Sequence, residues 1–270
     1  MLRLIPILVL VALWVGACGA SPHRTHHADP VRRGHSHNDY NRKRPLQQAL
    51  ELGYGSIEAD IWLVDGVLLV GHDREDLKPE RTLVAMYLDP LAARARERGA
   101  IYGKDDPPLQ LLIDIKSSGE RAYAALHELL RERSDVFSEC NDGRVTERAV
   151  KVVISGACPR ETIAAQTRRW AFVDGRKRDL EGDAGAPTSL VPLVSEAWTT
   201  YFSWPGIGEM PEAQRAKLRE LVTRAHARGY TLRFWGAPQV EGIWREQYAA
   251  GVDWINADDL KKGAEFLRGR

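Results

Sequence analysis

Acidic side chains at three points in the first half of the chain have the types and spacing that binding of a divalent cation favours. Glu58 and Asp60 stand two residues apart in an apolar segment, so strand alternation points both carboxylates to the same side. Without a cation, two acids this close would drive one pKa upward. Asp114 interrupts another apolar run, and an unpaired acid is costly in a protein core.

These acids predict a site for a divalent cation, Mg²⁺ or Ca²⁺, with Glu58, Asp60 and Asp114 as ligands. Hard cations prefer oxygen ligands, and Asn38 could add its side-chain carbonyl. Lys116 follows Asp114 by two residues, on the same face of a strand, where its ammonium group could contact a phosphate oxygen. The alternative is an ion pair between these groups that only stabilises the fold.

Histidines near these acids could carry protons. His37 is one candidate, with His35 as the competing assignment, and His72 is the second. One imidazole could accept a proton from the nucleophile while the other gives one to the leaving oxygen, and a metal ion would neutralise the developing charge. Asp73 directly follows His72 and could orient its imidazole.

Strand-like and helical segments alternate around these motifs, which predicts βα units about a parallel sheet. Strands are expected at residues 31–35, 56–63, 110–116, 150–154, 171–173, 191–195, 231–235 and 253–256. Eight units favour an α/β single domain, the TIM-type (β/α)8 barrel. An open doubly wound sheet is the alternative, but no glycine-rich phosphate loop follows the first strand. The loops after barrel strands share one face, and the motifs above stand at those strand ends.

Local signals add detail to the barrel. Ser117 and Glu120 form a capping-box pattern, and residues 67–70 predict an additional strand paired with the second. His127 and His226 fall inside helical patterns, so we expect them to be structural. Glycine follows four expected helix ends, where a left-handed residue is favoured: Gly53, Gly99, Gly229 and Gly251.

Two further groups bear on what the site could bind. Arg233 and Trp235 alternate onto one face of the seventh strand, as a candidate phosphate ligand and a candidate pocket wall. Four aromatic residues follow the sixth strand and suit either an acyl chain, a ring or a bilayer surface, or a lid packed on the barrel rim: Trp198, Tyr201, Phe202 and Trp204.

The N-terminal residues 1–21 predict a targeting segment. Arg3 precedes an apolar run over residues 4–15, and small residues follow; the run is short for a membrane span. The sequence ending at Cys18 resembles a bacterial lipobox, which predicts lipidation of Cys18 and an exported cell-envelope lipoprotein. Cleavage near Ala20, giving a secreted or periplasmic protein, is the alternative. Residues 22–30 read as a linker before a folded domain at residues 31–270.

Charge and cysteine content indicate which partners and which disulfide the chain could have. The 270 residues include 38 Lys or Arg and 37 Asp or Glu, so no overall field favours nucleic acid as a partner, and we expect a monomer. Besides Cys18 the chain has Cys140 and Cys158. In an oxidising compartment this pair could form a disulfide, and two separate thiols are the alternative.

Taken together, the motifs resemble the phospholipase C-like phosphodiesterase superfamily, and within it the family of altered inheritance of mitochondria protein 6. The resemblance runs from about residue 34 to residue 260. It departs from glycerophosphodiester phosphodiesterases, whose His-Arg-Gly and Pro-Glu-Asn patterns are absent. The motifs that carry it are Ser36-His37-Asn38, Ile57-Glu58-Ala59-Asp60-Ile61-Trp62, Asp65-Gly66, Gly71-His72-Asp73, Ile113-Asp114-Ile115-Lys116 and Asp258-Asp259-Leu260.

This resemblance implies a phosphoric diester hydrolase with a TIM-type barrel and a divalent cation. By position it assigns His37 and His72 to proton transfer, and Glu58 and Asp60 to the metal. The implied substrate is a small-molecule or lipid phosphodiester, either phospholipid-derived or of the glycerophosphodiester type. The alternatives are a lyase that stops at a cyclic phosphate, and a non-catalytic envelope lipoprotein that binds a phosphorylated ligand.

Overall fold

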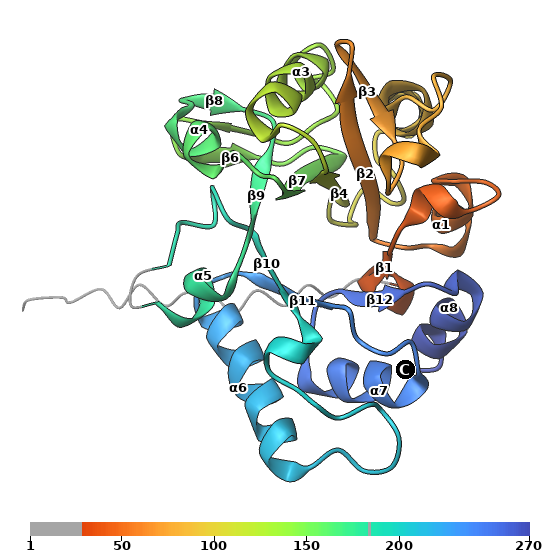
Figure 1. The fold of residues 1–270 in the computed structure, drawn as a ribbon, viewed down its shortest axis with the longest axis vertical. Helices are drawn as coiled ribbons and strands as arrows, with labels where there is room; N and C mark the ends of the chain where they lie inside the picture. The colour runs from red at the N-terminus through yellow and green to blue at the C-terminus, as the bar shows by residue number, and fades with distance from the viewer. Residues whose placement is uncertain (1–28, 183–184) are drawn as a thin grey trace, which may run out of the picture.

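Eight parallel strands form a nearly closed barrel in the computed structural model, which describes residues 29–182 and 185–270 (Figure 1). Hydrogen bonds join them in the order β11-β10-β9-β7-β4-β2-β1-β12. The strands are β1 Gly34–Ser36, β2 Ser56–Val64, β4 Leu109–Ile115, β7 Val150–Gly156, β9 Phe172–Gly175, β10 Leu193–Ala197, β11 Thr231–Trp235 and β12 Ile255–Ala257. The predicted targeting segment with Cys18, and most of the predicted linker, lie outside the described residues.

The ends of this strand order meet, which confirms the TIM-type (β/α)8 barrel. The first and last strands, β1 and β12, pair directly in parallel. A single bridge between Arg233 on β11 and Trp254, just before β12, joins the two ends of the order. An open doubly wound sheet has free edges at these positions, so that alternative is wrong.

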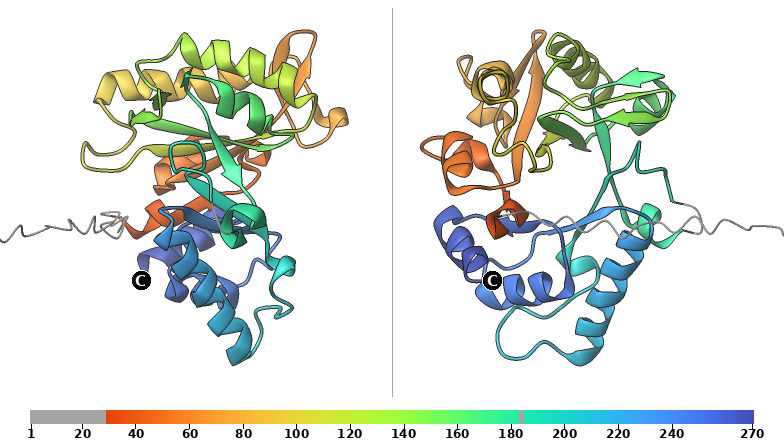
Figure 2. Two further views of the ribbon diagram at one scale, coloured as in Figure 1. Left: turned by 90° about the vertical axis from the view of Figure 1, so that its left-hand side faces the viewer. Right: turned by 180° about the vertical axis from the view of Figure 1, so that it is seen from behind.

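Helices alternate with the strands and surround the barrel (Figure 1). In both views of Figure 2, α6, α7 and α8 lie at one end of the molecule, and α2 and α3 at the other. Within residues 29–182 and 185–270, no helix has the length and hydropathy needed to cross a bilayer. The helices are α1 Gln47–Leu52, α2 Asp89–Arg98, α3 Gly119–Arg131, α4 Arg160–Ala165, α5 Lys177–Glu181, α6 Glu212–Ala227, α7 Glu241–Ala250 and α8 Leu260–Arg268.

Four strands lie outside the parallel barrel. The predicted strand β3 (Val67–Val70) is confirmed and pairs antiparallel with β2. A small antiparallel sheet of β5 (Glu139–Asn141), β6 (Arg144–Thr146) and β8 (Arg168–Arg169) was not predicted. Its hairpin turns through Asp142 and Gly143, both with positive φ, which is a favoured two-residue turn.

Two local predictions are wrong. Residues 31–33 belong to the short helical turn η1 (Pro30–Arg33). The backbone amide of Val31 donates a hydrogen bond to the side chain of Asp29 at the start of this turn, and β1 begins only at Gly34. Ser117 and Glu120 do not cap α3, because the Ser117 hydroxyl accepts from the backbone of Leu63. The predicted helix ends are confirmed, and the glycines there adopt positive φ: Gly53, Gly99, Gly229 and Gly251.

Cys140 and Cys158 do not form the disulfide that was one of the two alternatives for this pair. Cys140 on β5 and Cys158 after β7 are both free thiols. Burial raises the pKa of the Cys158 thiol to about 12, so it stays protonated at neutral pH. The alternative of two separate thiols is therefore correct.

The barrel interior contains one apolar cluster, and buried polar side chains lie around it. Leu112 pairs in register with both Glu58 on β2 and Val153 on β7, so these three side chains point the same way. On the β4 to β10 side the interior is filled by a buried cluster that includes Leu112, Val153, Phe172 and Leu193. Buried polar side chains occur on every barrel strand, and those on β1, β2, β11 and β12 surround the predicted site: His35, Ser56, Glu58, Asp60, Arg233 and Asn256.

Candidate active site

The strand register brings the three predicted acids together. Pairing of β2 with β4 places Asp60 opposite Asp114, and Glu58 precedes Asp60 by two residues on the same face. One carboxylate oxygen of each residue lies within 4.8 Å of the others. Glu58 and Asp60 are buried. This arrangement could hold a metal ion.

Lys116 lies inside this acidic cluster. Its ammonium nitrogen is 3.0 Å from Oδ2 of Asp60 and 3.2 Å from Oδ1 of Asp114, so the predicted alternative ion pair exists. Nevertheless, burial and the neighbouring Glu58 raise the pKa of Asp60, and its Oδ1 is buried without a hydrogen-bond partner. Lys116 and Arg233 bring two positive charges to three carboxylates, so the all-oxygen donor set fits a further, hard cation.

Glu58 is held by donors that all approach one oxygen, Oε2. His35 Nε2 lies 3.2 Å from it, a guanidinium nitrogen of Arg233 3.4 Å, the backbone amide of Asn38 3.4 Å, and His37 Nε2 3.9 Å. Burial disfavours a charge here, but Arg233 and His35 outweigh it and hold the pKa of Glu58 well below its usual range. Glu58 is therefore ionised at neutral pH.

The two candidates for the first histidine differ in solvent access. The side chain of His37 is 27% exposed, and its Nδ1 lies 2.7 Å from Oδ1 of Asp258. His35 is fully buried, and burial followed by the charge of Arg233 lowers its pKa to about 3. A buried imidazole with both nitrogens engaged, by Ser56 and by Glu58, is poorly placed for proton exchange with a substrate, so the geometry favours His37.

His72 reaches the same cluster from the loop after β3. Its side chain is 50% exposed, and Nδ1 lies 2.9 Å from Oδ2 of Asp60, so Asp60 rather than Asp73 orients the ring. The Tyr40 hydroxyl lies 2.8 Å from Asp60 Oδ2, 2.7 Å from Asn38 Oδ1 and 3.2 Å from His72 Nδ1. Burial and Asp60 raise the pKa of Tyr40, so it remains a protonated donor.

Tyr40 and Asp258 are two residues of the site that were not predicted from the sequence. Asp258 begins the Asp258-Asp259-Leu260 motif that carried the resemblance, and Tyr40 follows the Ser36-His37-Asn38 motif by two residues, but neither had an assigned role. The hydrogen bond from His37 lowers the pKa of Asp258. The other two residues of the Asp258-Asp259-Leu260 motif are structural, since Asp259 caps α8 and Leu260 is buried.

The predicted substrate residues lie on β11 at the same mouth. Arg233 is buried and donates from Nε to Asn256 Oδ1 at 2.8 Å, while Trp235, two residues later, is 42% exposed. Asn256 Nδ2 is buried without a hydrogen-bond partner. Arg233 thus first serves to hold Glu58 and Asn256, and Trp235 is the one that faces outward.

The aromatic loop after β10 packs on the barrel rim. Trp198, Phe202 and Trp204 are buried, and Trp198 and Phe202 contact the ring of Phe234 at centroid distances of 5.7 and 5.6 Å. Of the two alternatives, packing against the barrel therefore holds for Trp198, Phe202 and Trp204, and these three residues do not form an exposed aromatic surface.

Three comparisons place the chain among known proteins. The AIM6-like phosphodiesterase domain matches residues 24–174. Altered inheritance of mitochondria protein 6 of Eremothecium gossypii is 30% identical, over 94% of this chain and 77% of that protein, and the homologue of Arthroderma benhamiae is 28% identical, over 86% and 83%. The fold is similar to that of a glycerophosphodiester phosphodiesterase from Parabacteroides distasonis ATCC 8503, with TM-score 0.52, 16% identity and coverage of 89% and 96% of the two chains.

A barrel of this type with this domain match defines a phosphoric diester hydrolase. More specifically, the chain belongs to the family of the AIM6-like phosphodiesterase domain. The expected family and the expected class of reaction are both confirmed.

Proposed function

We propose that the chain hydrolyses a phospholipid-derived or glycerophosphodiester-type substrate with one divalent cation and two histidines. The observation that carries this proposal is that two solvent-accessible imidazoles contact one carboxylate cluster. His37 Nε2 lies 3.9 Å from Glu58 Oε2, and His72 Nδ1 lies 2.9 Å from Asp60 Oδ2. A phosphodiester bound beside the carboxylates would have a proton-transfer group on either side.

The cation would be Mg²⁺ or Ca²⁺, held by Glu58, Asp60 and Asp114. Asn38 Oδ1, which lies 2.7 Å from the Tyr40 hydroxyl, would be a further ligand. When bound, it would stabilise negative charge on the phosphate oxygens. Support comes from Glu58, whose contacts within the described residues all reach Oε2, so that Oε1 is left for a cation. Lys116, at 3.0 Å from Asp60, would add a second positive charge beside the phosphate.

The two histidines are oriented for proton transfer in the same way as each other. Each Nδ1 faces a carboxylate, Asp258 for His37 and Asp60 for His72, and each Nε2 is then presented to the substrate. One Nε2 takes the proton of the attacking water as its oxygen bonds to phosphorus. The other gives a proton to the leaving oxygen as the second phosphorus–oxygen bond breaks.

Apolar side chains on the catalytic face support a substrate with an apolar part. Trp235 at the end of β11, Ile207 in the loop after β10 and Val240 in the loop after β11 are among the exposed large hydrophobic residues. Loops that follow barrel strands lie at the catalytic face. A phospholipid-derived molecule would bring its headgroup phosphate to the acids and its apolar part to these residues.

We also propose that the protein is exported and anchored to the cell envelope by lipidation of Cys18. The support is the charged start, apolar run and lipobox-like sequence of residues 1–21. An anchored enzyme would meet lipid substrates at a membrane surface, which agrees with the apolar residues at the mouth.

Turnover assays test the proposed reaction. The full chain would be assayed with bis-p-nitrophenyl phosphate, lysophospholipids and glycerophosphodiesters, each with Mg²⁺, Mn²⁺ or Ca²⁺ and again with a chelator. We expect hydrolysis that needs a cation and that fails in His37→Ala, with His127→Ala as the matched control because His127 lies on α3. Phosphorus NMR would distinguish a monoester product from a cyclic phosphate. No turnover with any cation would contradict the proposal.

A further inference from the structure

Below the catalytic carboxylates, three polar side chains on neighbouring strands form one row inside the barrel. The registers place His35 opposite Ser56 and Ser56 opposite Gln110, so all three point to the same side. Each is buried. Ser56 precedes Glu58 by two residues on β2, so the row lies one layer beneath that carboxylate.

An unbroken series of hydrogen bonds joins this row to Glu58. Nε2 of Gln110 donates to Oγ of Ser56 at 2.8 Å. Oγ of Ser56 lies 2.7 Å from Nδ1 of His35, and Nε2 of His35 lies 3.2 Å from Oε2 of Glu58. Oε2 of Glu58 is also approached by the backbone amide of Asn38 and the guanidinium of Arg233, which can only donate hydrogen bonds, so it acts as an acceptor and His35 must carry a hydrogen on Nε2.

The donors in this series all point toward Glu58. A neutral imidazole carries one hydrogen, so a hydrogen on Nε2 leaves Nδ1 of His35 as an acceptor. The Ser56 hydroxyl then donates to Nδ1, and its oxygen accepts the amide hydrogen of Gln110. A hydroxyl can donate and accept at once, so each group in the series is satisfied.

We infer that Ser56 is a positioning residue for Glu58, and that Gln110, as a hydrogen-bond donor, leaves the Ser56 hydroxyl directed to His35. The Ser56 hydroxyl holds His35 in the tautomer with hydrogen on Nε2, and that tautomer fixes Oε2 of Glu58 and leaves Oε1 for a cation. The consequence for cation binding rests on the proposed function. The direction of the hydrogen bonds does not rest on the proposed function, because it can be measured without cation or substrate.

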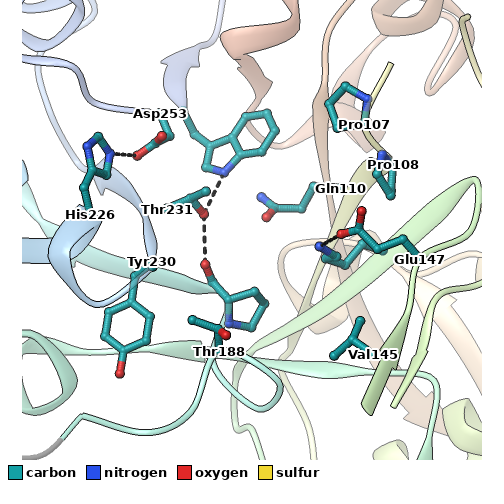
Figure 3. Close-up of a pocket in the computed structure, with 14 residues that line it drawn as sticks. Pro107, Pro108, Gln110, Val145, Glu147, Thr188, His226, Tyr230, Thr231 and Asp253 are labelled. Carbon is teal, nitrogen blue, oxygen red and sulfur yellow. Dashed lines mark hydrogen bonds and ion pairs between the residues drawn. The ribbon is translucent and has the colours of Figure 1, made fainter. Parts of the chain in front are cut away.

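The surroundings of Gln110 make the inference testable. Gln110 lines a cavity of 380 Å³ at the amino-terminal ends of the strands, and its carboxamide lies between Thr231 and Pro108 in Figure 3. Side chains of similar length therefore fit at position 110 without overpacking. Gln110→Glu replaces the donor with an acceptor, whereas Gln110→Met removes the hydrogen bond and leaves Ser56 free to donate to His35.

Long-range proton–nitrogen NMR of the full chain with labelled histidine tests the tautomer directly, with His35 assigned by its loss in His35→Gln. We expect hydrogen on Nε2 only in the unaltered chain and in Gln110→Met. In Gln110→Glu the new carboxylate accepts from Ser56, so Nδ1 of His35 should become protonated. Hydrogen on Nδ1 in the unaltered chain, or an unchanged His35 in Gln110→Glu, would overturn the inference.

Calorimetric titration with Mn²⁺ tests the consequence for Glu58. We expect Gln110→Glu to weaken Mn²⁺ binding about tenfold or more, in the range seen when partners of metal ligands are changed, and Gln110→Met to stay within about threefold of the unaltered chain. Equal losses in both variants would show a packing role and overturn the inference. If the unaltered chain binds no Mn²⁺, the proposed function fails, and the NMR result alone decides the hydrogen-bond direction.

Discussion

Nδ1 of His37 lies 2.7 Å from Oδ1 of Asp258, although the two residues are 221 positions apart in the chain. The contact forms because β1 and β12 pair as the first and last strands of the barrel, and each residue directly follows its strand. A carboxylate on Nδ1 fixes the orientation of the imidazole and leaves Nε2 for the substrate. Closing the barrel thus completes the proposed acid–base group.

Asp258→Asn should lower kcat about 10- to 100-fold, the usual loss when the partner of a functional imidazole is altered. The amide keeps the shape but no longer stabilises the charged ring. Steady-state kinetics would measure the change. Asp259→Asn is the matched control, because asparagine caps a helix as well as aspartate and Asp259 caps α8. Equal activity of Asp258→Asn and the control would contradict the assignment.

His37→Ala and His35→Ala should fail in different ways. His37 is partly exposed, so its loss should lower kcat by about 10²- to 10⁴-fold with a change in unfolding free energy within about 0.5 kcal/mol. His35 is fully buried and hydrogen-bonded at both nitrogens, so its truncation should destabilise the fold by at least about 1 kcal/mol. Kinetics and urea unfolding of both variants would decide, and the reverse pattern would make His35 the first catalytic histidine.

Cation binding should stabilise the folded chain through the three acids. At a cation concentration of 100 times Kd, the free energy of unfolding should rise by about 2.7 kcal/mol. Thermal unfolding with and without Mg²⁺ would show the shift, and a chelator would reverse it. Asp114→Asn should abolish most of the shift, whereas Asp73→Asn, outside the cluster, should keep it. An equal shift in both variants would place the cation elsewhere.

His226 should make the stability depend on pH near neutrality. Its Nε2 lies 2.9 Å from Oδ2 of Asp253 (Figure 3), and this hydrogen bond raises its pKa above the ordinary 6.5. The stabilisation is therefore complete below that value and is lost as pH rises through the folded-state pKa. Urea unfolding from about pH 5.5 to 9 should show this decline in the unaltered chain and not in His226→Gln. Parallel profiles would contradict the prediction.

Cys18→Ser should release the protein from membranes, because one diacylated cysteine is the proposed anchor. Fractionation of cells that express the full chain would measure this. Replacing Cys158, a free thiol in the barrel domain, serves as the control and should leave the distribution unchanged. An unaltered distribution for Cys18→Ser would exclude the lipobox.

The alternation of side chains along a strand could be used to predict the site, because this pattern involves only residues two or three positions apart. The spacing of Glu58 and Asp60, and the acid Asp114 within an apolar run, locate strand ends and shared faces without knowledge of the pairing. The glycine at position 53, with φ of 100°, ends its helix where the pattern indicated. These features depend on local geometry, which is encoded by neighbouring residues.

Other features depended on contacts between distant segments. Whether His35 or His37 faces solvent is decided by burial against Ser56 and Glu58, and the role of Asp258 required β12 to lie beside β1. The hairpin of β5 and β6 was missed although Asp142-Gly143 is a turn signal, because its strands are only three residues long. Short strands carry little periodicity of their own.

The central claim is that one cation binds where Glu58, Asp60 and Asp114 converge. A crystal structure with Mn²⁺, using the anomalous signal of the metal, tests it most directly. The account predicts one strong peak about 2.0–2.6 Å from an oxygen of each of the three carboxylates, with His37 and His72 on either side. A peak at another site, or no peak in crystals of protein that hydrolyses its substrate without added or bound metal, would contradict it.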